Sequence, residues 1–582
     1  MNHGAVALLG LGLLLGGCSG DGRPEPSRSE PDAAPSDSPI RLVRADAIDA
    51  LVRPHVGGSP TVDYIIDSLG SGGAWLDYDN DGDPDLYLAQ GATIDRPADG
   101  PPDQLLRNDG SPDGGPPSFT DVTEAAGLGD RRWSFGVATA DYDNDGDPDI
   151  YLANWGENRL YRNNGDGTFT DLAREAGVAD RRWGVSAAWS DTDRDGDLDL
   201  YVTNYVEFEF DRYPARGEPS GGGGPPCVWK SIEVFCGPRN LEASEDAFYR
   251  NDGDPDGDGV PSFVDATQSA GLALDEPLYG LAVHFFDADN DGDDDLYVAN
   301  DSVMNNYFVN RGDGTFEDQA ILTGLAYNEQ GNEQAGMGVA AGDVNGDGLL
   351  DLAVTNFSHD HDTVYRNDGG LFTDVSYSSG IGSASFLTLA WGVSFVDLDQ
   401  DGREDLAIAQ GHVYPQVDGR EIGTSFRQPN RIYRNVDGQF EELPAGSAPA
   451  LAVPKSSRAL MPVDVEGDGD IDLLLTNLND RPDLLLNESP AGNWLQVRLV
   501  GQRSNRDGIG ARIVATVGGR NQMREIRRNT GFAASSLPVA HFGLGTARSV
   551  DELEVRWPSG LVSRLEQVAA NRQLTVRESD AR

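Results

Sequence analysis

The sequence predicts an all-β fold in which a seven-bladed β-propeller is followed by a small β-sandwich-like domain. Three observations support this prediction. The 582 residues include 72 Gly and 33 Pro, which disfavour long helices. A nine-residue acidic pattern occurs seven times along the chain. The copies start 50 to 96 residues apart, which leaves room for about four short strands in each interval, the content of one propeller blade.

Composition excludes several classes of protein. The chain has 97 acidic and 44 basic residues and a net charge of −53, so it is poorly suited to binding nucleic acid. Its 38% hydrophobic content is too high for general disorder. Single hydrophobic cores stop growing at about 250–300 residues, so a chain of this length should contain repeats or several domains.

Residues 1–18 resemble the signal peptide of a bacterial lipoprotein. The apolar run at residues 5–15 is too short to span a bilayer, and it leads into Leu15-Gly16-Gly17-Cys18. In that family the cysteine, here Cys18, is acylated and becomes the mature N-terminus. A plain secretory signal or a short uncleaved anchor is the alternative. Residues 19–40 are rich in Pro, Ser and Asp and are predicted to be a disordered linker. We therefore expect an exported protein, lipid-anchored to the outer membrane or cell surface, with a periplasmic location as the alternative.

Export makes a disulfide between Cys227 and Cys236 the expected state of these two residues. They are separated by eight residues and have no nearby histidine, which gives little support to a redox or metal site. Both lie in the longest interval between acidic patterns, together with a Gly/Pro-rich stretch. We predict an insertion near residues 206–245.

The acidic pattern reads D-x-[DNE]-x-D-G-x-x-D. Oxygens at places one, three and five of a tight loop converge on one point when glycine at place six permits a sharp turn, and place nine closes the shell. Place seven would contribute its backbone carbonyl. The candidate metal ligands are Asp77, Asp79, Asp81 and Asp85; Asp141, Asp143, Asp145 and Asp149; Asp191, Asp193, Asp195 and Asp199; Asp287, Asp289, Asp291 and Asp295; Asp343, Asn345, Asp347 and Asp351; Asp397, Asp399, Asp401 and Asp405; Asp464, Glu466, Asp468 and Asp472.

Calcium is the cation that best fits this pattern, and about seven ions are expected. An EF-hand is excluded, because place twelve holds Leu88 or Leu152 inside strand-like runs instead of a glutamate. Magnesium prefers fewer protein ligands and a strict octahedron. Simple acidic turns are the alternative, which seven copies in the same register disfavour. Without a cation, carboxylates held within about 4 Å would repel by several kcal/mol at an effective dielectric near 20.

Two further patterns accompany each acidic loop. Small-residue strands precede it, as expected where strands converge on an axis. An aromatic or leucine strand ending in asparagine follows it, and most copies continue into a Gly-turn hairpin. These asparagines are Asn108, Asn163, Asn251, Asn310, Asn367, Asn435 and Asn487. The last copy lacks the hairpin, so we expect its outer strand to come from the N-terminal side, near residues 61–67.

The acidic loops resemble the FG-GAP (VCBS) repeats of integrin-type β-propellers, here assigned to residues 41–490. Residues 491–582 resemble the ASPIC/UnbV domain, through segments such as Ser504 to Arg512 and His541-Phe542-Gly543-Leu544-Gly545. With Cys236-Gly237-Pro238-Arg239 and Gly411-His412-Val413-Tyr414-Pro415, the whole chain is similar to bacterial relatives of cartilage acidic protein. The resemblance implies an exported calcium-binding propeller with a small β domain, and leaves the biochemical activity undefined.

Charge is distributed unevenly between the two predicted domains. Residues 491–582 contain 14 Arg, no Lys and 8 acidic residues, a net charge of +6, which leaves −59 for the remainder. This asymmetry suggests that the C-terminal domain docks on the acidic repeats or on an acidic external partner. A solvated basic face is the alternative.

No catalytic motif accompanies the seven histidines. His359-Asp360-His361-Asp362 could ligate a transition metal, although a surface loop is favoured. His412 beside Tyr414 could line a pocket, although a structural role is favoured. We predict a calcium-stabilised binding or adhesion module for a protein or polysaccharide, in contact with membranes only through its lipid anchor. A carbohydrate-active lyase or hydrolase, or a structural component of a surface complex, is the alternative.

Overall fold

The structure is a computed structural model that describes residues 39–581 except 112–115, 221–223, 256, 258, 445 and 491. Its regular elements are overwhelmingly β-strands, and each of the three α-helices in the described residues has four or five residues. This confirms the all-β prediction. The predicted signal peptide, Cys18 and most of the linker lie outside the described residues. No helix within them is both long and apolar enough to cross a membrane.

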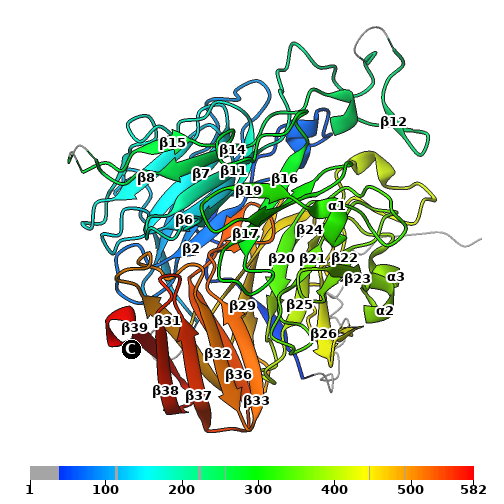
Figure 1. Ribbon diagram of the computed structural model, residues 1–582. Coiled ribbons are helices and arrows are strands. Elements are labelled where there is room, and N and C mark those ends of the chain that lie inside the picture. The colour runs from blue at the N-terminus through cyan, green and yellow to red at the C-terminus, as the bar shows by residue number, and fades with distance from the viewer. Residues whose placement is uncertain are drawn as a thin grey trace, which may run out of the picture.

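Seven sheets in the described residues share one antiparallel arrangement, in which four strands are added in order (Figure 1). Six of them are formed by strands that follow one another along the chain. They are β2–β5 (Gly73–Leu76, Asp85–Leu88, Gln104–Asn108, Phe119–Asp121), β6–β9 (Trp133–Ala140, Asp149–Trp155, Arg159–Asn163, Phe169–Asp171), β10, β11, β14 and β15 (Gly184–Ser190, Asp199–Asn204, Ala247–Asn251, Phe263–Asp265), β16–β19 (Gly280–Phe286, Asp295–Asn300, Asn306–Asn310, Phe316–Asp318), β20–β23 (Val339–Gly342, Asp351–Val354, Thr363–Asn367, Phe372–Asp374) and β24–β27 (Ala390–Val396, Asp405–Gln410, Arg431–Val436, Gln439–Glu442).

The remaining sheet contains β28 (Ser457–Val463), β29 (Asp472–Asn477) and β30 (Asp483–Asn487), and takes its outer strand from β1 (Leu42–Ala45). An N-terminal outer strand was expected, but its predicted place near residues 61–67 is wrong. A short 3-10 helix, Ile65–Ser68, lies there instead. Its isoleucines are buried in a central hydrophobic cluster, which an edge strand could not provide.

The first strands of the seven sheets pack against one another in chain order, and β28 also contacts β2. All eight residues of β6 and all seven of β10 are buried. Small residues are required at this junction. A Cβ atom on Gly136 would lie 2.3 Å from the carbonyl oxygen of Val185 in the next sheet, and one on Gly338 would lie 2.2 Å from that of Trp391. The small-residue strands in the sequence therefore mark the surfaces where neighbouring sheets approach most closely.

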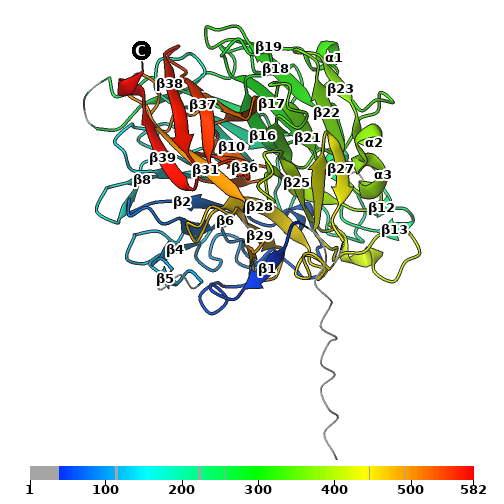
Figure 2. The ribbon, with the colours of Figure 1, turned by 90° about the horizontal axis from the view of Figure 1, so that it is seen from below.

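The C-terminal residues form a separate pair of sheets around their own core, which includes Leu495, Phe542 and Trp557. One sheet has the order β36-β31-β39 and the other β33-β32-β37-β38. The strands are β31 (Asn493–Val500), β32 (Arg512–Val517), β33 (Arg520–Glu525), β36 (Val539–Gly545), β37 (Ser549–Arg556), β38 (Val562–Ala569) and β39 (Arg572–Arg577). In Figure 1 they lie below the repeats, and in Figure 2 they lie in front of them.

One stretch of the C-terminal domain, residues 529–536, leaves its sheets and runs among the first strands of the repeats. We call it the axial segment. It includes β34 (Asn529–Thr530) and β35 (Ala534–Ser535), and β35 pairs in parallel with β2. Its contacts reach the first strand of every sheet: Ala534 with β2, Ala533 with Val137 and Ser186, Asn529 with Val283, Gly531 with Val339, Phe532 with Trp391, and Thr530 with Leu460. The axial segment was not predicted from the sequence.

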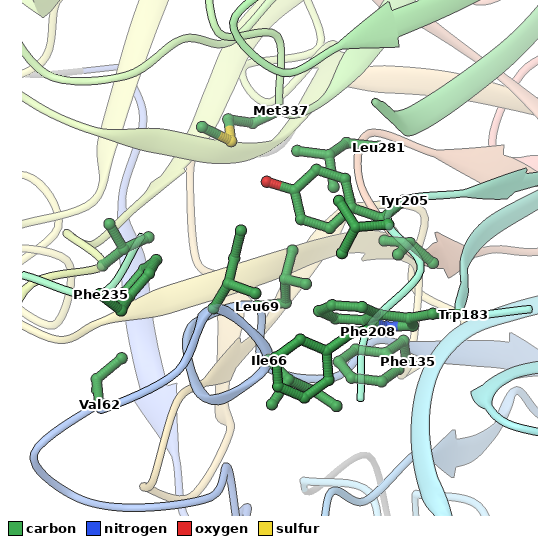
Figure 3. Packing of buried hydrophobic residues seen from close by; sticks show 14 of the residues in the cluster. Val62, Ile66, Leu69, Phe135, Trp183, Tyr205, Phe208, Phe235, Leu281 and Met337 are labelled. Atoms are coloured by element: carbon green, nitrogen blue, oxygen red, sulfur yellow. The ribbon is translucent and has the colours of Figure 1, made fainter. Parts of the chain in front are cut away.

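A central hydrophobic cluster continues from the axial segment toward the opposite side of the repeats. Figure 3 shows part of it, in which Phe135 of β6 and Trp183, the residue before β10, meet Ile66 and Leu69 from the N-terminal segment, together with Phe208. The chain around Phe208 belongs to the predicted insertion. That insertion also contains a two-stranded hairpin, β12 (Val228–Trp229) and β13 (Ile232–Glu233), closed by the disulfide Cys227–Cys236. The predicted disulfide is thus present.

Candidate metal centres

Each acidic loop connects the first and second strands of its sheet, and each second strand begins at the place-nine aspartate. Place six is glycine with φ between +82° and +103°, as the sequence predicts. Place four also has positive φ, between +55° and +75°, in all seven loops. It is occupied by Asn80, Asn144, Arg194, Asn290, Gly346, Gln400 and Gly467. The loops therefore need two left-handed positions, only one of which is always glycine.

Two backbone hydrogen bonds occur in every loop. The place-six N–H donates to the place-one carboxylate over 2.8–3.4 Å. The place-seven N–H donates to the place-five carboxylate over 2.8–3.0 Å. These bonds hold one oxygen of each carboxylate and orient the other.

Several carboxylate oxygens of the acidic loops are buried and accept no hydrogen bond from the described part of the chain. They include Oδ1 of Asp141, Asp191 and Asp287 at place one and Oδ1 of Asp399 at place three. A buried carboxylate oxygen without a partner is costly unless a cation neutralises it. Burial first, and then the charges of Asp507 and Asp143, raise the pKa of Asp141 to about 8 in the metal-free chain. A bound cation would reverse this effect.

In five loops, carboxylate oxygens of three residues lie within 4.8 Å of one another. The groups are Asp77, Asp79 and Asp85; Asp141, Asp143 and Asp149; Asp191, Asp193 and Asp195; Asp287, Asp289 and Asp291; and Asp397, Asp399 and Asp405. Hard, charged oxygen donors converging in this way fit a calcium ion. Among the described residues, the loops at Asp343 and Asp464 form no such group. Their third places hold Asn345, which donates to Asp347 over 2.9 Å, and the longer Glu466.

Place nine has a structural function in addition to its predicted role as a ligand. One oxygen accepts the backbone N–H of the asparagine at the end of the third strand, or one residue before its end in β26, over 2.7–2.9 Å in all seven sheets. In six of them the other oxygen accepts the place-two N–H. In the remaining case, Asp295 accepts from the hydroxyl of Tyr307 at 2.6 Å. This aspartate therefore fixes the loop to its own sheet.

The same asparagine connects neighbouring sheets. Its side-chain Nδ2 donates to the place-two carbonyl of the acidic loop in the preceding sheet, over 2.7–3.3 Å. Asn163 donates to Tyr78, for example, and Asn108 of the first sheet donates to Val465 of the last. All seven asparagines are buried. The sequence pattern contained these asparagines, but it did not predict their bonds between sheets. Each acceptor lies at least 79 residues away along the chain, and the acceptor of Asn108 lies 357 residues away.

The C-terminal domain covers the side of the repeats on which the acidic loops lie. Arg527 pairs with Asp294, Arg524 lies 3.2 Å from Glu404, and the Gly543 N–H donates to Asp397 over 3.1 Å. Gln496 donates to Asp464 over 2.7 Å. These contacts confirm the expectation that the basic domain docks on the acidic repeats.

The histidine-containing segment at residues 359–362 contributes no metal group in the described part of the chain. His361 and Asp362 are buried, so the favoured surface-loop interpretation is wrong for them. His361 Nε2 lies 3.7 Å from Asp374, and the backbone of Asn356 donates to Asp362.

Comparisons with known proteins agree with the two-part organisation. The FG-GAP-like repeat family matches residues 77–152, 141–202, 287–354 and 343–408, and the family described as ASPIC and UnbV matches residues 501–582. Cartilage acidic protein 1 from Homo sapiens is 29% identical over 284 residues, which cover 46% of this chain and 40% of that protein. The Xenopus tropicalis protein is 26% identical over 311 residues, with 50% and 44% covered. The match thus spans less than half the length of these relatives.

Solved structures give weaker similarities. An Agrocybe aegerita lectin that recognises non-reducing terminal N-acetylglucosamine is 16% identical, covering 70% of this chain and 88% of its own, with a TM-score of 0.35. BBS1N in complex with ARL6DN is 11% identical, covering 77% and 97%, with a TM-score of 0.36. At these scores neither structure supports an argument about this chain. The family matches and the repeated geometry together establish that this chain is a protein of FG-GAP-like repeats with a C-terminal ASPIC and UnbV domain.

Proposed function

We propose that this protein is an exported, calcium-stabilised binding module in which the seven sheets are the blades of a closed β-propeller. Support for closure comes from the contact between β28 and β2 and from the hydrogen bond of Asn108 to Val465, which joins the first sheet to the last. An open array of sheets would leave these groups exposed at its two ends.

The observation that carries the calcium proposal is the place-one carboxylate of three loops, Asp141, Asp191 and Asp287. It keeps one buried oxygen unpartnered within the described residues while its other oxygen accepts the place-six N–H. Calcium would be held by the oxygens at places one, three, five and nine and by the place-seven carbonyl, and would supply the positive charge that the loop lacks. The binding is structural, because it cross-links residues within one loop.

Elemental analysis and calorimetric titration of chelator-treated protein test this proposal. We expect about seven calcium ions per chain and a rise in melting temperature as they bind. Protein that remains folded with no calcium after exposure to millimolar calcium would contradict it.

The expected location follows from the lipoprotein-type leader, and the Cys227–Cys236 disulfide is consistent with an oxidising compartment. Mass spectrometry of the membrane fraction should find a diacylated N-terminus at Cys18. A Cys18→Ser variant should be released from the membrane, and an unmodified wild-type N-terminus would contradict lipid anchoring.

The binding function would be served by the side of the repeats opposite the acidic loops, because the C-terminal domain covers the loop side. A screen of immobilised glycans and extracellular proteins, run with calcium and again with chelator, tests for a partner. Calcium-dependent capture supports the proposal, and the absence of any partner under both conditions contradicts it.

A further inference from the structure

A pocket of about 390 Å³ lies on the side of the repeats opposite the acidic loops. Its walls come from the disulfide-closed insertion and from loops that follow the second strands β17, β21 and β25, whereas the acidic loops precede those strands. Figure 1 places the insertion strand β12 and the C-terminal domain at opposite ends of the molecule. The pocket and the candidate metal centres are therefore separate sites.

The pocket is closed at its inner end. Phe532 of the axial segment packs against Trp391, with 4.8 Å between ring centroids, and Trp391 lines the pocket. Both rings are buried. Because the C-terminal domain fills the junction of the first strands, a ligand could enter only from the outer side.

Aromatic rings form one wall. Phe235 and Tyr414 lie 4.8 Å apart, and Trp229 lies 6.0 Å from Tyr414 and 5.7 Å from Phe357. Phe235 and Tyr414 are buried, whereas Trp229 is only half-buried and keeps part of its ring accessible. The disulfide fixes Trp229 and Phe235, since the two bonded cysteines bracket their hairpin. This wall presents a preorganised apolar surface.

Polar groups form the other wall, and most are held by contacts within the protein. Arg239 donates to the Ser302 carbonyl and pairs with Glu333. The Tyr205 hydroxyl donates to Asp301 over 2.5 Å, and Gln334 donates to Asp360 over 2.8 Å. These partners satisfy hydrogen-bonding groups of the acids, and Arg239 also neutralises the charge of Glu333.

His359 is the exception to this pairing. Its Nε2 lies 2.9 Å from the Ile422 carbonyl, which can only accept, so Nε2 carries the hydrogen and Nδ1 is an acceptor in the neutral ring. Nδ1 is buried and has no hydrogen-bond partner within the described residues. Burial, and then the charge of Lys230, lower the pKa of His359 and keep it neutral. His359 lines the pocket and has φ of +68°, a strained conformation that is typical of ligand sites.

Two sequence motifs that the candidate metal centres leave unexplained meet here. The segment Cys236-Gly237-Pro238-Arg239 contributes Gly237, Pro238 and Arg239 to the lining, and Gly411 to Pro415 contributes Val413 and Tyr414. His412 is fully buried beneath them. It lies 2.9 Å from Ser358 and packs against Trp229.

We propose that this pocket binds the end of a neutral glycan, one or two sugar units long. The flat apolar face of a pyranose ring packs on aromatic rings such as Trp229. Its hydroxyl groups both donate and accept hydrogen bonds, which suits a wall that mixes the donor Arg239 with the acceptors Asp360 and His359. The volume lies at the lower end of the range for small-molecule sites, about 300–1,000 Å³. A net charge of −53 disfavours polyanionic chains. This inference names the partner class and site of the proposed binding module and rests on that function.

The test uses the full-length mature protein, loaded with calcium, on an array that carries neutral oligosaccharides, sulfated polysaccharides, and extracellular proteins and basic peptides. Neutral oligosaccharides of glucose, galactose, mannose and N-acetylglucosamine are then titrated while tryptophan fluorescence is recorded. We expect binding to at least one neutral series, with a fluorescence change. Trp229→Ala should weaken binding at least 30-fold and remove most of that change, whereas Trp229→Phe should retain part of the affinity.

The matched control is Val228→Ala, a neighbouring substitution at a 66% exposed side chain, which should bind as the wild type does. Calcium content and melting temperature should be the same in all variants, which shows that they are folded. Glycan binding that is unchanged in Trp229→Ala, or capture of sulfated chains or basic peptides alone, would overturn the pocket assignment. Protein capture that is independent of Trp229 would overturn this inference while leaving the proposed binding module intact.

Discussion

The two sides of the repeat domain are built by opposite means. On the acidic-loop side, the same turn, the same backbone hydrogen bonds and the same buried asparagine recur in all seven sheets, and the protein's own C-terminal domain covers them. The other side carries a single irregular insertion with a disulfide and a pocket lined by motifs that occur once. Repetition suits stability, because every copy adds a similar contribution to the free energy of unfolding. Recognition of a ligand needs a surface on which the copies differ.

Removal of calcium should have the largest effect, and it should act through the repeated side. A site filled at one hundred times its dissociation constant contributes about 2.7 kcal/mol. Chelation of the ions from seven such sites should therefore lower the melting temperature by on the order of 15–20 °C. Differential scanning calorimetry with calcium and with chelator measures this shift.

Reduction of the Cys227–Cys236 disulfide provides the contrast, because it changes only the irregular side. Its short loop contributes about 2.6 kcal/mol in the chain-entropy account. If the chelator lowers the melting temperature no more than the reductant does, the acidic-loop side is not the main source of stability.

Substitution of Phe532 by alanine should have the next largest effect, because this residue joins the two sides. Its ring is 1% exposed and packs against Trp391 at the inner end of the pocket. Loss of a buried phenylalanine costs about 3–5 kcal/mol. Urea unfolding at saturating calcium measures the loss, and Phe386→Ala, at a 42% exposed ring, is the control. Equal stabilities of the two variants would show that the axial segment contributes little.

The sequence predicted the features that depend on residues close to one another in the chain. Place six had to be glycine because the turn requires positive φ there, and the spacing of oxygens in each loop follows from nine consecutive residues. The axial segment was not predicted, because Asn529 to Ser536 owe their position to seven strands distant in the chain. The N-terminal outer strand was misplaced for a similar reason. Residues 61–67 looked suitable for a strand, yet Ile65 and Ile66 are held by the central cluster.

A single acidic loop should contribute a smaller and local share. Asp145→Ala removes the place-five carboxylate, which also accepts the N–H of Asp147 over 2.9 Å. We expect one calcium ion fewer per chain and a loss of about 2.7 kcal/mol, the value for one site. The control is Asp166→Ala, an exposed aspartate in the hairpin turn of the same sheet, which accepts from Thr168. An unchanged calcium count in Asp145→Ala would exclude this loop as a metal site.

The smallest effect should come from the protonation of His412 on the irregular side. Burial, and then the charge of Arg458, lower its pKa to about 3 in the folded protein, against about 6.5 when unfolded. Between these values the unfolded chain binds a proton that the folded chain does not. Stability therefore falls as the pH is lowered, by about 1.4 kcal/mol per unit and by about 2 kcal/mol at pH 5.

The variant His412→Gln removes this proton uptake. It should be less stable than the wild type at pH 7, because the side chain accepts the Tyr414 N–H over 3.0 Å and contacts Ser358. The difference should shrink by about 2 kcal/mol at pH 5, as measured by urea unfolding of both proteins at saturating calcium. The acidic loops titrate alike in both proteins, so their contribution cancels in this difference. An equal pH dependence of wild type and variant would mean that His412 has the same pKa in the folded and unfolded states, which is incompatible with its burial beneath Trp229.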